Sequence, residues 1–562
     1  MQRGWNMSQK FENSLSLALE TPEEQRAMTP DLNVGFDERN GTWEVIVKYS
    51  GNLERLRSLG MQVEELIAGY GIVTLPEQDF ELLSSAPEIE YVEKPRSFTY
   101  SQISPVQEPC IATVLATPPF YTGKGVLMAI LDSGVDVRRR EFRNADGTSR
   151  VKGYLEFTGR ERREYTKEQL NNALSGNGEL PSVAGTSHGT AVAGVAAGFA
   201  SANGNPGNRT YRGVARGCDL LVVNLGADTA EEAQTANIMR GVTYALTKAR
   251  QWNQPLVINL SFGNAYGNHR GESLLERFLD NASEQGRTTI CVGMGNKGEA
   301  YHHFASQSEG EYLAEVSVLP YLRSMTVQIW QEFKGSREIT ITSPEGQNVV
   351  LSQQTREESY RIQMGATLLL LYFGLPSPYS TSQEIYMEFL PRRDFVTEGT
   401  WRIQGTGACN MYLTGRENPE SGFSFLSPDS QGTLTIPSTA SRVISVGAYD
   451  SNTEVYSSFS GRGFPGTGKP DIVAPGENIL APWGESSYRG FTGTSFATPI
   501  VSGCAAIMME RGIVQGENPY LYGEKLKAYV RAGAGRLRGV QSEPNVRTGW
   551  GKICLSNSMD LW

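Results

Sequence analysis

The chain has 562 residues, more than one hydrophobic core supports, so we expect roughly two to four domains. Its 51 Lys and Arg against 61 Asp and Glu give a net charge of −10, which argues against nucleic acid as the main partner. A hydrophobic content of 39% with 61 glycines is typical of a globular, turn-rich α/β protein and excludes a fibrous or disordered chain.

The sequence shows neither a targeting segment nor a metal-binding pattern. Met1–Phe11 lacks the apolar core of a secretory signal, and the most apolar run elsewhere, Ala366–Leu375, is too short to span a bilayer. We therefore predict no signal peptide, no membrane span and a cytoplasmic location. The 6 cysteines form no CxxC pair, so we expect free thiols in a reducing compartment. The 4 histidines have no metal-ligand spacing with the cysteines, and we predict no metal site.

The N-terminal hundred residues begin with a polar stretch, residues 1–33, that we interpret as a loose leader. Alternating strands and short helices follow, which together predict a small α+β domain. The expected strands are Trp43–Val47, Tyr70–Leu75 and an edge strand Ile89–Glu93, and the expected helices are Leu53–Leu66 and Gln78–Ser85. A domain of about 60 residues is marginal alone, so we expect it to dock on something larger. Pro95–Glu108 is a predicted linker.

The next region alternates apolar strands with helices, which predicts βαβ units and a parallel sheet flanked by helices. The predicted strands are Gly125–Leu131, Leu220–Leu225, Pro255–Leu260, Thr288–Gly293 and, much later, Arg442–Gly447. Helices are expected over Thr229–Gln251 and near Leu526–Ala532. Between residues 301 and 432 only short alternating strands and Gly/Pro turns remain, which predicts an inserted β-sandwich of about 130 residues.

Four polar residues stand at the ends of these elements, and each has an ordinary structural explanation. Asp132 follows a buried strand, where active sites of open α/β sheets lie, but turn aspartates are common there. His188 begins a helix of small residues, and Asn296 lies among glycines as turn asparagines do. Ser495 precedes the apolar run Ala497–Met509 at a helix start, the place of a helix cap and also of a nucleophile that generates an oxyanion.

Taken together, the four residues match one chemistry. Nucleophilic acyl transfer needs a serine (Ser495), a histidine that takes its proton (His188), a carboxylate that orients the histidine (Asp132) and a donor to the oxyanion (Asn296). Each lies in its own glycine-rich motif, in the order Asp, His, Asn, Ser. Such a set rarely arises by chance, so we predict a hydrolytic active site.

These motifs resemble those of the subtilisin-type serine proteases. The matching segments are Leu131–Gly134, Ser187–Thr190, Gly295–Asn296 and Gly493–Pro499, together with Lys469–Gly476. The resemblance implies a subtilisin-like fold and an endopeptidase acting on protein substrates. It also implies that Ser261, Phe262 and Gly263 form the substrate-binding strand, and we expect Phe262 to narrow or cap the pocket for the substrate side chain.

The N-terminal domain resembles the propeptide of that family, an intramolecular chaperone and inhibitor. The resemblance implies self-cleavage near Tyr100 or Gln102, with the propeptide remaining bound afterwards. The expected domains are 1–100 (leader plus propeptide), 101–300 and 433–562 (the two catalytic parts) and 301–432 (the insert). An insert at this position resembles the jelly roll of the Csp proteases of clostridial spores, which activate a cortex-lytic hydrolase during germination; this makes a bacterial, spore-associated location a further expectation.

Two departures and one rival hypothesis qualify the resemblance. Glu141 stands where the family often has a calcium-binding Asp, and Ser201–Arg212 does not match the usual calcium loop, so no calcium site or other cofactor is predicted. Ile500 follows Pro499 where many relatives have histidine. The rival hypothesis is a catalytically silent pseudoprotease that acts as a binding or signalling protein, as some Csp proteins do; the intact Asp132, His188 and Ser495 favour the enzyme.

Overall fold

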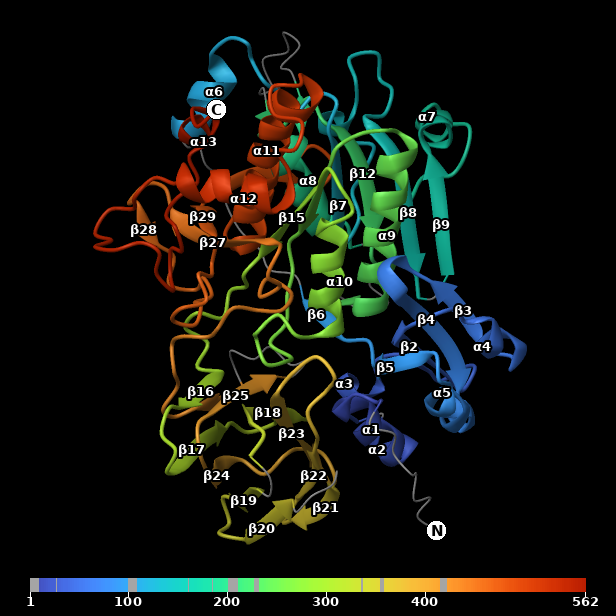
Figure 1. The fold of residues 1–562 in the computed structure, drawn as a ribbon, viewed down its shortest axis with the longest axis vertical. Coiled ribbons are helices and arrows are strands. Elements are labelled where there is room, and N and C mark those ends of the chain that lie inside the picture. Colours follow the sequence, from blue (N-terminus) through green and yellow to red (C-terminus); the bar gives the residue numbers. More distant parts are fainter. Residues whose placement is uncertain are drawn as a thin grey trace. The chain divides into compact units, whose positions relative to one another are not determined.

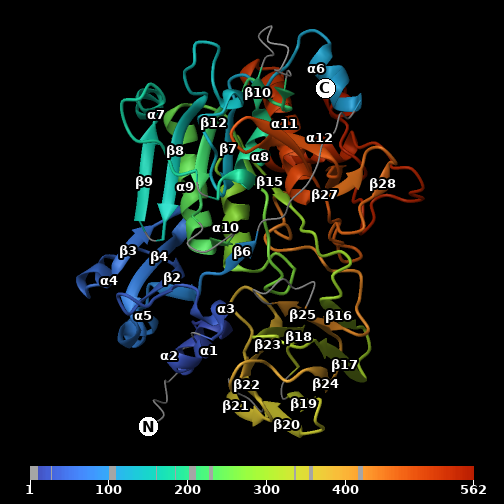
Figure 2. The same cartoon turned by 180° about the vertical axis from the view of Figure 1, so that it is seen from behind.

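The structure is a computed structural model that describes residues 10–26, 28–99, 109–159, 161–183, 185–200, 211–226, 232–334, 337–353, 358–414 and 422–562. It divides into two compact units (Figures 1 and 2). The first unit comprises Met1–Ser97, Ala265–Leu274 and Glu299–Gly432, and the second comprises Phe98–Asn264, Leu275–Gly298 and Thr433–Trp562. The chain therefore passes between the units several times.

A nine-stranded sheet forms the centre of the second unit, in the order β28-β27-β15-β14-β7-β12-β8-β9 with β29 beside β27. Its inner strands are parallel, as the alternating pattern predicted, and β9 and β28 are antiparallel at its edges. The bounds are β7 (Leu127–Asp132), β8 (Val151–Thr158), β9 (Glu161–Thr166), β12 (Asp219–Asn224), β14 (Leu256–Leu260), β15 (Thr288–Gly293), β27 (Ile444–Asp450), β28 (Val455–Tyr456) and β29 (Ile472–Pro475).

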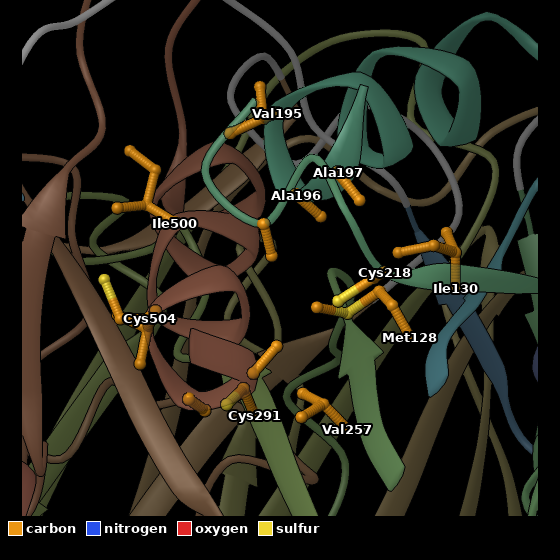
Figure 3. Close-up of a cluster of buried hydrophobic side chains, with 14 of the residues drawn as sticks. Met128, Ile130, Val195, Ala196, Ala197, Cys218, Val257, Cys291, Ile500 and Cys504 are labelled. Carbon is orange, nitrogen blue, oxygen red and sulfur yellow. The ribbon is translucent and has the colours of Figure 1, made fainter. Parts of the chain in front are cut away.

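Helices cover this sheet because alternate strand residues point to opposite faces. Met128 and Ile130 of β7 share one buried cluster with residues of α8 and α11, several of which Figure 3 labels. On the other face, Gly241 of α9 lies against Leu131. The helices of this unit include α7 (Lys167–Leu174), α8 (Ser187–Ala197), α9 (Thr235–Gln251), α10 (Leu274–Ser283, whose first residue belongs to the first unit), α11 (Thr494–Met509) and α12 (Gly523–Ala532).

Helix α11 is the central helix of the second unit. It contacts β14, β15, β27 and β29 of the sheet and also α8. With its extension to Val514, it is the one helix in the described part of the chain that is long and apolar enough to cross a membrane by length and composition. Of its apolar window, 83% is buried inside the protein, so its composition is explained by the core that it fills.

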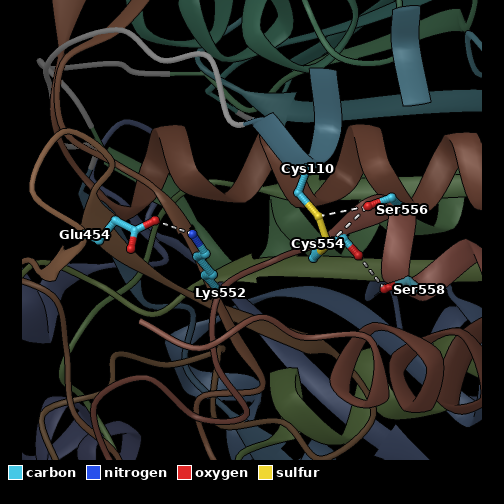
Figure 4. Close-up of a disulfide and its surroundings, with 6 residues drawn as sticks. All are labelled: Cys110, Glu454, Lys552, Cys554, Ser556 and Ser558. Carbon is cyan, nitrogen blue, oxygen red and sulfur yellow. Dashed lines mark hydrogen bonds and ion pairs between the residues drawn. A yellow bond between two sulfur atoms is a disulfide. The ribbon is translucent and has the colours of Figure 1, made fainter. Parts of the chain in front are cut away.

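A disulfide ties the beginning of the second unit to its end (Figure 4). It joins Cys110 in α6 (Pro109–Ala116) to Cys554, just before α13 (Leu555–Met559), with Cα atoms 5.1 Å apart. The expectation of six free thiols is therefore wrong for this pair. No spacing rule identifies a pair that lies 444 residues apart in sequence. The other cysteines are buried thiols that form no disulfide within the described residues: Cys218, Cys291, Cys409 and Cys504.

The N-terminal domain belongs to the first unit and contains a five-stranded antiparallel sheet, in which β2 pairs with β1, β4 and β5. Its strands are β1 (Phe36–Asp37), β2 (Thr42–Tyr49), β3 (Gln62–Glu65), β4 (Tyr70–Pro76) and β5 (Ile89–Glu93). The predicted helix Leu53–Leu66 is wrong in its second half. Helix α4 (Glu54–Ser58) ends before Gly60, whose φ of +88° reverses the chain, and β3 follows.

The expected loose leader is also wrong over its described part. Residues from Lys10 onward fold as α1 (Asn13–Glu20), α2 (Glu23–Arg26) and α3 (Pro30–Asn33), and Leu15 is completely buried. Helix α1 contacts strands β22 and β23 of the insert. Serines alternate with the apolar residues of α1, so the sequence shows no clear helical pattern there. The strands that bury α1 lie more than 300 residues later in the chain.

The insert consists of two antiparallel sheets around one core. One sheet has the order β16-β25-β18-β23-β22-β21 and the other β20-β19-β24-β17-β26. Residues of both, such as Ile329 and Trp401, belong to one buried cluster, which confirms a β-sandwich; a jelly-roll connection stays a prediction. The bounds are β16 (His303–Ser306), β17 (Glu311–Val318), β18 (Met325–Glu332), β19 (Arg337–Thr342), β20 (Asn348–Gln353), β21 (Glu358–Met364), β22 (Thr367–Phe373), β23 (Ser382–Pro391), β24 (Gly399–Thr406), β25 (Cys409–Thr414) and β26 (Phe423–Phe425).

The N-terminal domain and the insert share a second core within the first unit. Leu370, Tyr372, Tyr386 and Leu390 of the insert are buried in one cluster with apolar side chains of α1, β2, β4 and α5. The expected docking of the small domain on something larger is thus confirmed, and its partner is the insert.

Buried charges lie beside this shared core. Asn13 of α1 donates to Glu384 at 2.8 Å, and Thr326 and Tyr386 donate to Glu388 at 2.9 and 2.6 Å. Burial, with the nearby Glu12 carboxylate, raises the pKa of Glu384 to about 7, although Arg96 opposes this. Burial, with the nearby Asp31 carboxylate, raises the pKa of Glu388 to about 8, against the effect of Lys94.

We predict that the first unit loses stability as the pH rises from about 5 to 8. In this range the folded protein holds protons on Glu384 and Glu388 that the unfolded chain, with a carboxyl pKa near 4.5, has released. The Glu384→Gln/Glu388→Gln variant should show a flatter dependence of the urea midpoint on pH. The control is Glu398→Gln on the exposed surface of the insert. Equal slopes for variant and control would contradict the prediction.

Candidate active site

Asp132 and His188 meet at the C-terminal edge of the parallel sheet. Asp132 is the last residue of β7 and His188 the second residue of α8. The His188 Nδ1 atom lies 2.7 Å from Asp132 Oδ1, and both side chains are buried, with 5% and 0% exposure. The Asp132 Oδ1 atom also accepts a hydrogen bond of 2.8 Å from the Ser133 amide. The carboxylate can therefore orient the imidazole and fix which ring nitrogen carries the proton.

The residue after the histidine makes this contact possible. A Cβ atom on Gly189 would overlap the carbonyl oxygen of Gly134 and lie 3.0 Å from Asp132 Oδ1. With glycine there, α8 begins directly against the turn that follows β7. The Gly189 amide donates to Ser133 Oγ at 3.1 Å, which joins the helix start to that turn. A glycine is thus needed directly after His188, because a side chain there would collide with the turn that follows β7.

Ser495 is the second residue of α11, at the helix N-terminus as expected. Its hydroxyl donates to the Ser261 carbonyl at 2.8 Å, and its own carbonyl accepts from Ser261 Oγ at 2.9 Å. The next side chain, Phe496, makes an edge-to-face contact with the His188 ring, with centroids 5.6 Å apart. These contacts bring the serine, the histidine and the chain after β14 together.

Asn296 follows β15 and faces the start of α11. Its Oδ1 atom accepts hydrogen bonds from the Thr494 amide at 3.0 Å and from Thr494 Oγ1 at 3.1 Å. These two hydrogen bonds fix which end of the amide is the oxygen. The Nδ2 donor at the other end lies beside Gly493, 3.1 Å from the position that a Cβ atom would take there. Thr494 therefore orients the amide. The sequence alone does not mark Thr494 as a site residue, although it lies within the serine motif.

The predicted substrate strand continues from β14, and its three residues differ in their surroundings. Ser261 contacts Ser495, as described, and its hydroxyl is held by Asn259, which accepts in turn from Ser502 of α11. Phe262 is buried, with 4% exposure. Gly263 lies against Thr435, another residue that the sequence alone does not mark as part of the site. The expected cleavage positions, Tyr100 and Gln102, lie outside the described residues.

Glu141, the position considered for calcium, is engaged by protein groups. Arg139 binds both of its oxygens, at 3.0 and 3.1 Å, and the Tyr488 hydroxyl donates to it as well. Burial disfavours the charged carboxylate, but these hydrogen bonds outweigh it and lower the pKa of Glu141. Within the described part of the chain, no cluster of three or more His, Cys, Asp or Glu is arranged to hold a metal ion.

The fold and the site together define a class: an α/β protein in which Asp, His, Ser and Asn residues meet at one edge of a parallel sheet, the set of groups that a serine hydrolase uses. Comparisons with known proteins give the family. The Subtilase family model matches residues 123–348 and 417–551, and the Csp protease B prodomain model matches residues 9–96. The chain belongs to the subtilase family, and its N-terminal domain is a prodomain of the Csp protease B type.

Individual relatives agree with this assignment. The structure of the CspB protease of Clostridium perfringens is similar, with a TM-score of 0.74 and 30% identity over 80% of this chain and 96% of that chain. Serine protease AprX of Bacillus subtilis is 34% identical over 24% of this chain and 33% of AprX. Subtilisin E of Bacillus subtilis is 27% identical over 40% of this chain and 49% of subtilisin E. The chain thus spans a third to a half of these two curated relatives.

We predict that Gly189→Ala lowers the free energy of unfolding by about 1–3 kcal/mol, because the added methyl group overpacks the turn at Gly134. It should also separate His188 from Asp132 and reduce peptide hydrolysis. Urea denaturation and a hydrolysis assay check both effects. The matched control is Gly535→Ala, where the nearest atom lies 3.4 Å from the Cβ position, an ordinary contact. Equal stability of the two variants would refute the prediction.

Proposed function

We propose that the protein is an active serine endopeptidase in which Ser495 is the nucleophile, His188 the general base and Asp132 the residue that orients His188. The observation that carries the proposal is the 2.7 Å contact of His188 with Asp132, together with the contact of the same ring with Phe496, the neighbour of Ser495. The Ser495 proton, donated to the Ser261 carbonyl in this structure, must pass to His188 as Ser495 attacks the peptide carbonyl. His188 then protonates the leaving amine.

The oxyanion of the tetrahedral intermediate would be bound by Asn296 Nδ2 and the Ser495 amide. The amide lies in the first turn of α11, where unpaired N–H groups and the helix dipole favour negative charge. The Thr494 hydrogen bonds hold Asn296 in place before the charge develops, so no reorganisation is needed during the reaction.

We predict that Asn296→Ala lowers kcat by about 10²–10³ while changing KM little, because the donor acts on the oxyanion of the transition state; this is the loss that removal of one such donor causes in a subtilisin. Steady-state kinetics on a peptide substrate measure it. Asn410→Ala, on β25 of the insert, serves as a control far along the chain from the site residues. An unchanged kcat in Asn296→Ala would remove Asn296 from the mechanism.

We also propose that the first substrate is the protein's own chain, near Tyr100 or Gln102. Strand β6 (Ser97–Thr99) pairs with β13 (Glu232–Gln234) and ends one residue before the first of these positions. Strand pairing is a common way for a protein to bind an extended peptide. The pairing of β6 with β13 supports the proposal, because it holds the chain just before the proposed cleavage site in the extended form of a bound substrate.

Ser495→Ala should therefore remain full length, whereas the wild type should be cleaved into a fragment of about 100 residues and the remainder. Denaturing gels and N-terminal sequencing of the freshly purified proteins measure this. Ser175→Ala, at the exposed C-terminal end of α7, is the control and should still be processed. A wild type that stays full length like Ser495→Ala would favour the pseudoprotease hypothesis.

The prodomain would stay bound after cleavage. Its core is continuous with that of the insert, and Leu15, Trp43 and Phe80 of the prodomain lie in the same buried cluster as Tyr372 and Tyr386 of the insert. Leaving would expose this apolar surface to water, which is strongly unfavourable. Retention of the prodomain is thus supported by packing alone.

The biological setting is proposed from the resemblance to the Csp proteases. We propose a bacterial, spore-associated or cytoplasmic enzyme that needs no cofactor and activates the precursor of a cortex-lytic hydrolase. The Csp protease B prodomain and the similarity to the Clostridium perfringens CspB protease support this proposal. Of these two locations, the Cys110–Cys554 disulfide favours the spore-associated one over the reducing cytoplasm expected from the sequence, because disulfides persist in oxidising surroundings.

A further inference from the structure

The guanidinium of Arg139 is buried in the turn that follows β7 and Asp132, and the side chain is only 1% exposed. Each of its five N–H groups donates a hydrogen bond. Two of these bonds reach the two carboxylate oxygens of Glu141, at 3.0 and 3.1 Å. The other three reach main-chain carbonyls, at 3.0, 2.6 and 3.0 Å; the acceptors are Trp483, Gly484 and Ser487. The turn after β7 is thereby fastened to a second, distant segment.

The three carbonyls belong to one hairpin that leads directly to the nucleophile. Its strands, β30 (Ile479–Trp483) and β31 (Ser487–Phe491), pair in antiparallel fashion. Only residues 492–494 separate the end of β31 from Ser495. The hairpin also packs on α8, the helix of His188, since α8 contacts β30. The position of this hairpin therefore affects two of the three groups that we assign to catalysis.

Aromatic contacts transmit the position of the hairpin to the site. The ring of Phe491, the last residue of β31, stacks on Phe496, with centroids 5.0 Å apart. Phe496 is the neighbour of Ser495, and its ring makes the edge-to-face contact with His188. Trp483 of β30 packs on the Phe491 ring as well, with centroids 5.7 Å apart. A shift of the hairpin would thus move the ring that packs on the histidine and the helix start that carries the serine.

The oxygen atoms around the guanidinium are of the kind that a calcium ion binds. Calcium takes six to eight oxygen ligands, which are mostly carboxylates and main-chain carbonyls. Here one carboxylate and three carbonyls converge on a single point, and Arg139 fills it, with its Cζ atom 5.5 Å from the ring centre of Tyr488. A calcium ion would have to displace the side chain, so the residues present do not fit a metal ion.

We propose that Arg139 is a positioning residue of the active site. Its guanidinium takes the structural role of a bound metal ion and holds the β30–β31 hairpin against the turn after β7. This fixes the place of Ser495 relative to His188 and Asp132. The inference rests on the proposed function of Ser495 as the nucleophile, and it concerns the alignment of the groups rather than the chemical step.

The test measures peptide hydrolysis by the full chain, after self-processing, for the wild type, Arg139→Ala and Arg138→Ala. Active-site titration gives the concentration of competent enzyme, so that kcat refers to folded protein. Arg139→Ala should lower kcat about 10–100-fold with a smaller change in KM, because misaligned groups slow the chemical step. Arg138→Ala is the matched control and should keep the kcat of the wild type, since Arg138 binds Asp136 with a side chain that is 44% exposed.

A second measurement tests whether the cation itself is needed. Arg139→Ala leaves the Glu141 carboxylate and the three carbonyls without their partner. Guanidinium chloride at concentrations far below those that denature proteins supplies the missing group, and calcium chloride supplies an ion that prefers the same oxygen ligands. One of these salts should raise the kcat of Arg139→Ala toward that of the wild type, and neither should raise kcat in Arg138→Ala.

The outcomes separate the positioning role from the function. Wild-type kcat in Arg139→Ala would overturn the inference while the proposed function stands, and so would a lowered kcat that neither salt raises. Hydrolysis that is the same in Ser495→Ala would overturn both. Melting temperatures monitor folding. If Arg139→Ala does not fold or does not process itself, Arg139→Lys decides alone.

The lysine variant keeps the charge but loses the planar fork. An ammonium group has three donors, which cannot hold the carboxylate and all three carbonyls at once. We therefore expect Arg139→Lys to lower kcat at least about tenfold. A kcat equal to that of the wild type in Arg139→Lys would overturn the inference.

Discussion

The contact between His188 and Asp132 depends on how closely a helix can approach a sheet. A histidine at the start of α8 reaches the end of β7 only because the helix carries almost no side-chain bulk at its beginning. The same requirement applies to α11, which packs on α8 and on five strands of the sheet and is buried along its whole length. Small residues in both helices thus set the distance between groups that come from distant parts of the sequence.

The sequence predicted the helices and strands whose apolar pattern is visible within a short window of residues. The parallel strands and the places of Asp132, His188, Asn296 and Ser495 at element ends followed from apolar runs and glycine-rich turns, because these signals are local. Residues that position a catalytic group were not identified, because their contacts are with residues distant in sequence. Thr494, Asn259 and Thr435 acquire importance only from what lies across from them in space, and a short motif does not record that.

The errors in the N-terminal domain have a related physical cause. Residues 10–33 were expected to be loose because their apolar side chains are few and interleaved with serine. They fold because the insert supplies the other half of their core, including Tyr372 and Tyr386. A segment whose stability depends on a surface encoded hundreds of residues later gives no sign of it in a local window. The prodomain and the insert are therefore best regarded as one folding unit.

The disulfide between Cys110 and Cys554 has a topological consequence. Together with the chain between them, the two cysteines close a covalent ring with a sequence separation of 444 residues. The four active-site residues and the whole insert lie inside this ring. A single nick in any surface loop of the ring would leave its residues joined in one covalent molecule. The enzyme can thus sustain one such cut, from itself or another protease, without shedding a fragment until the disulfide is reduced.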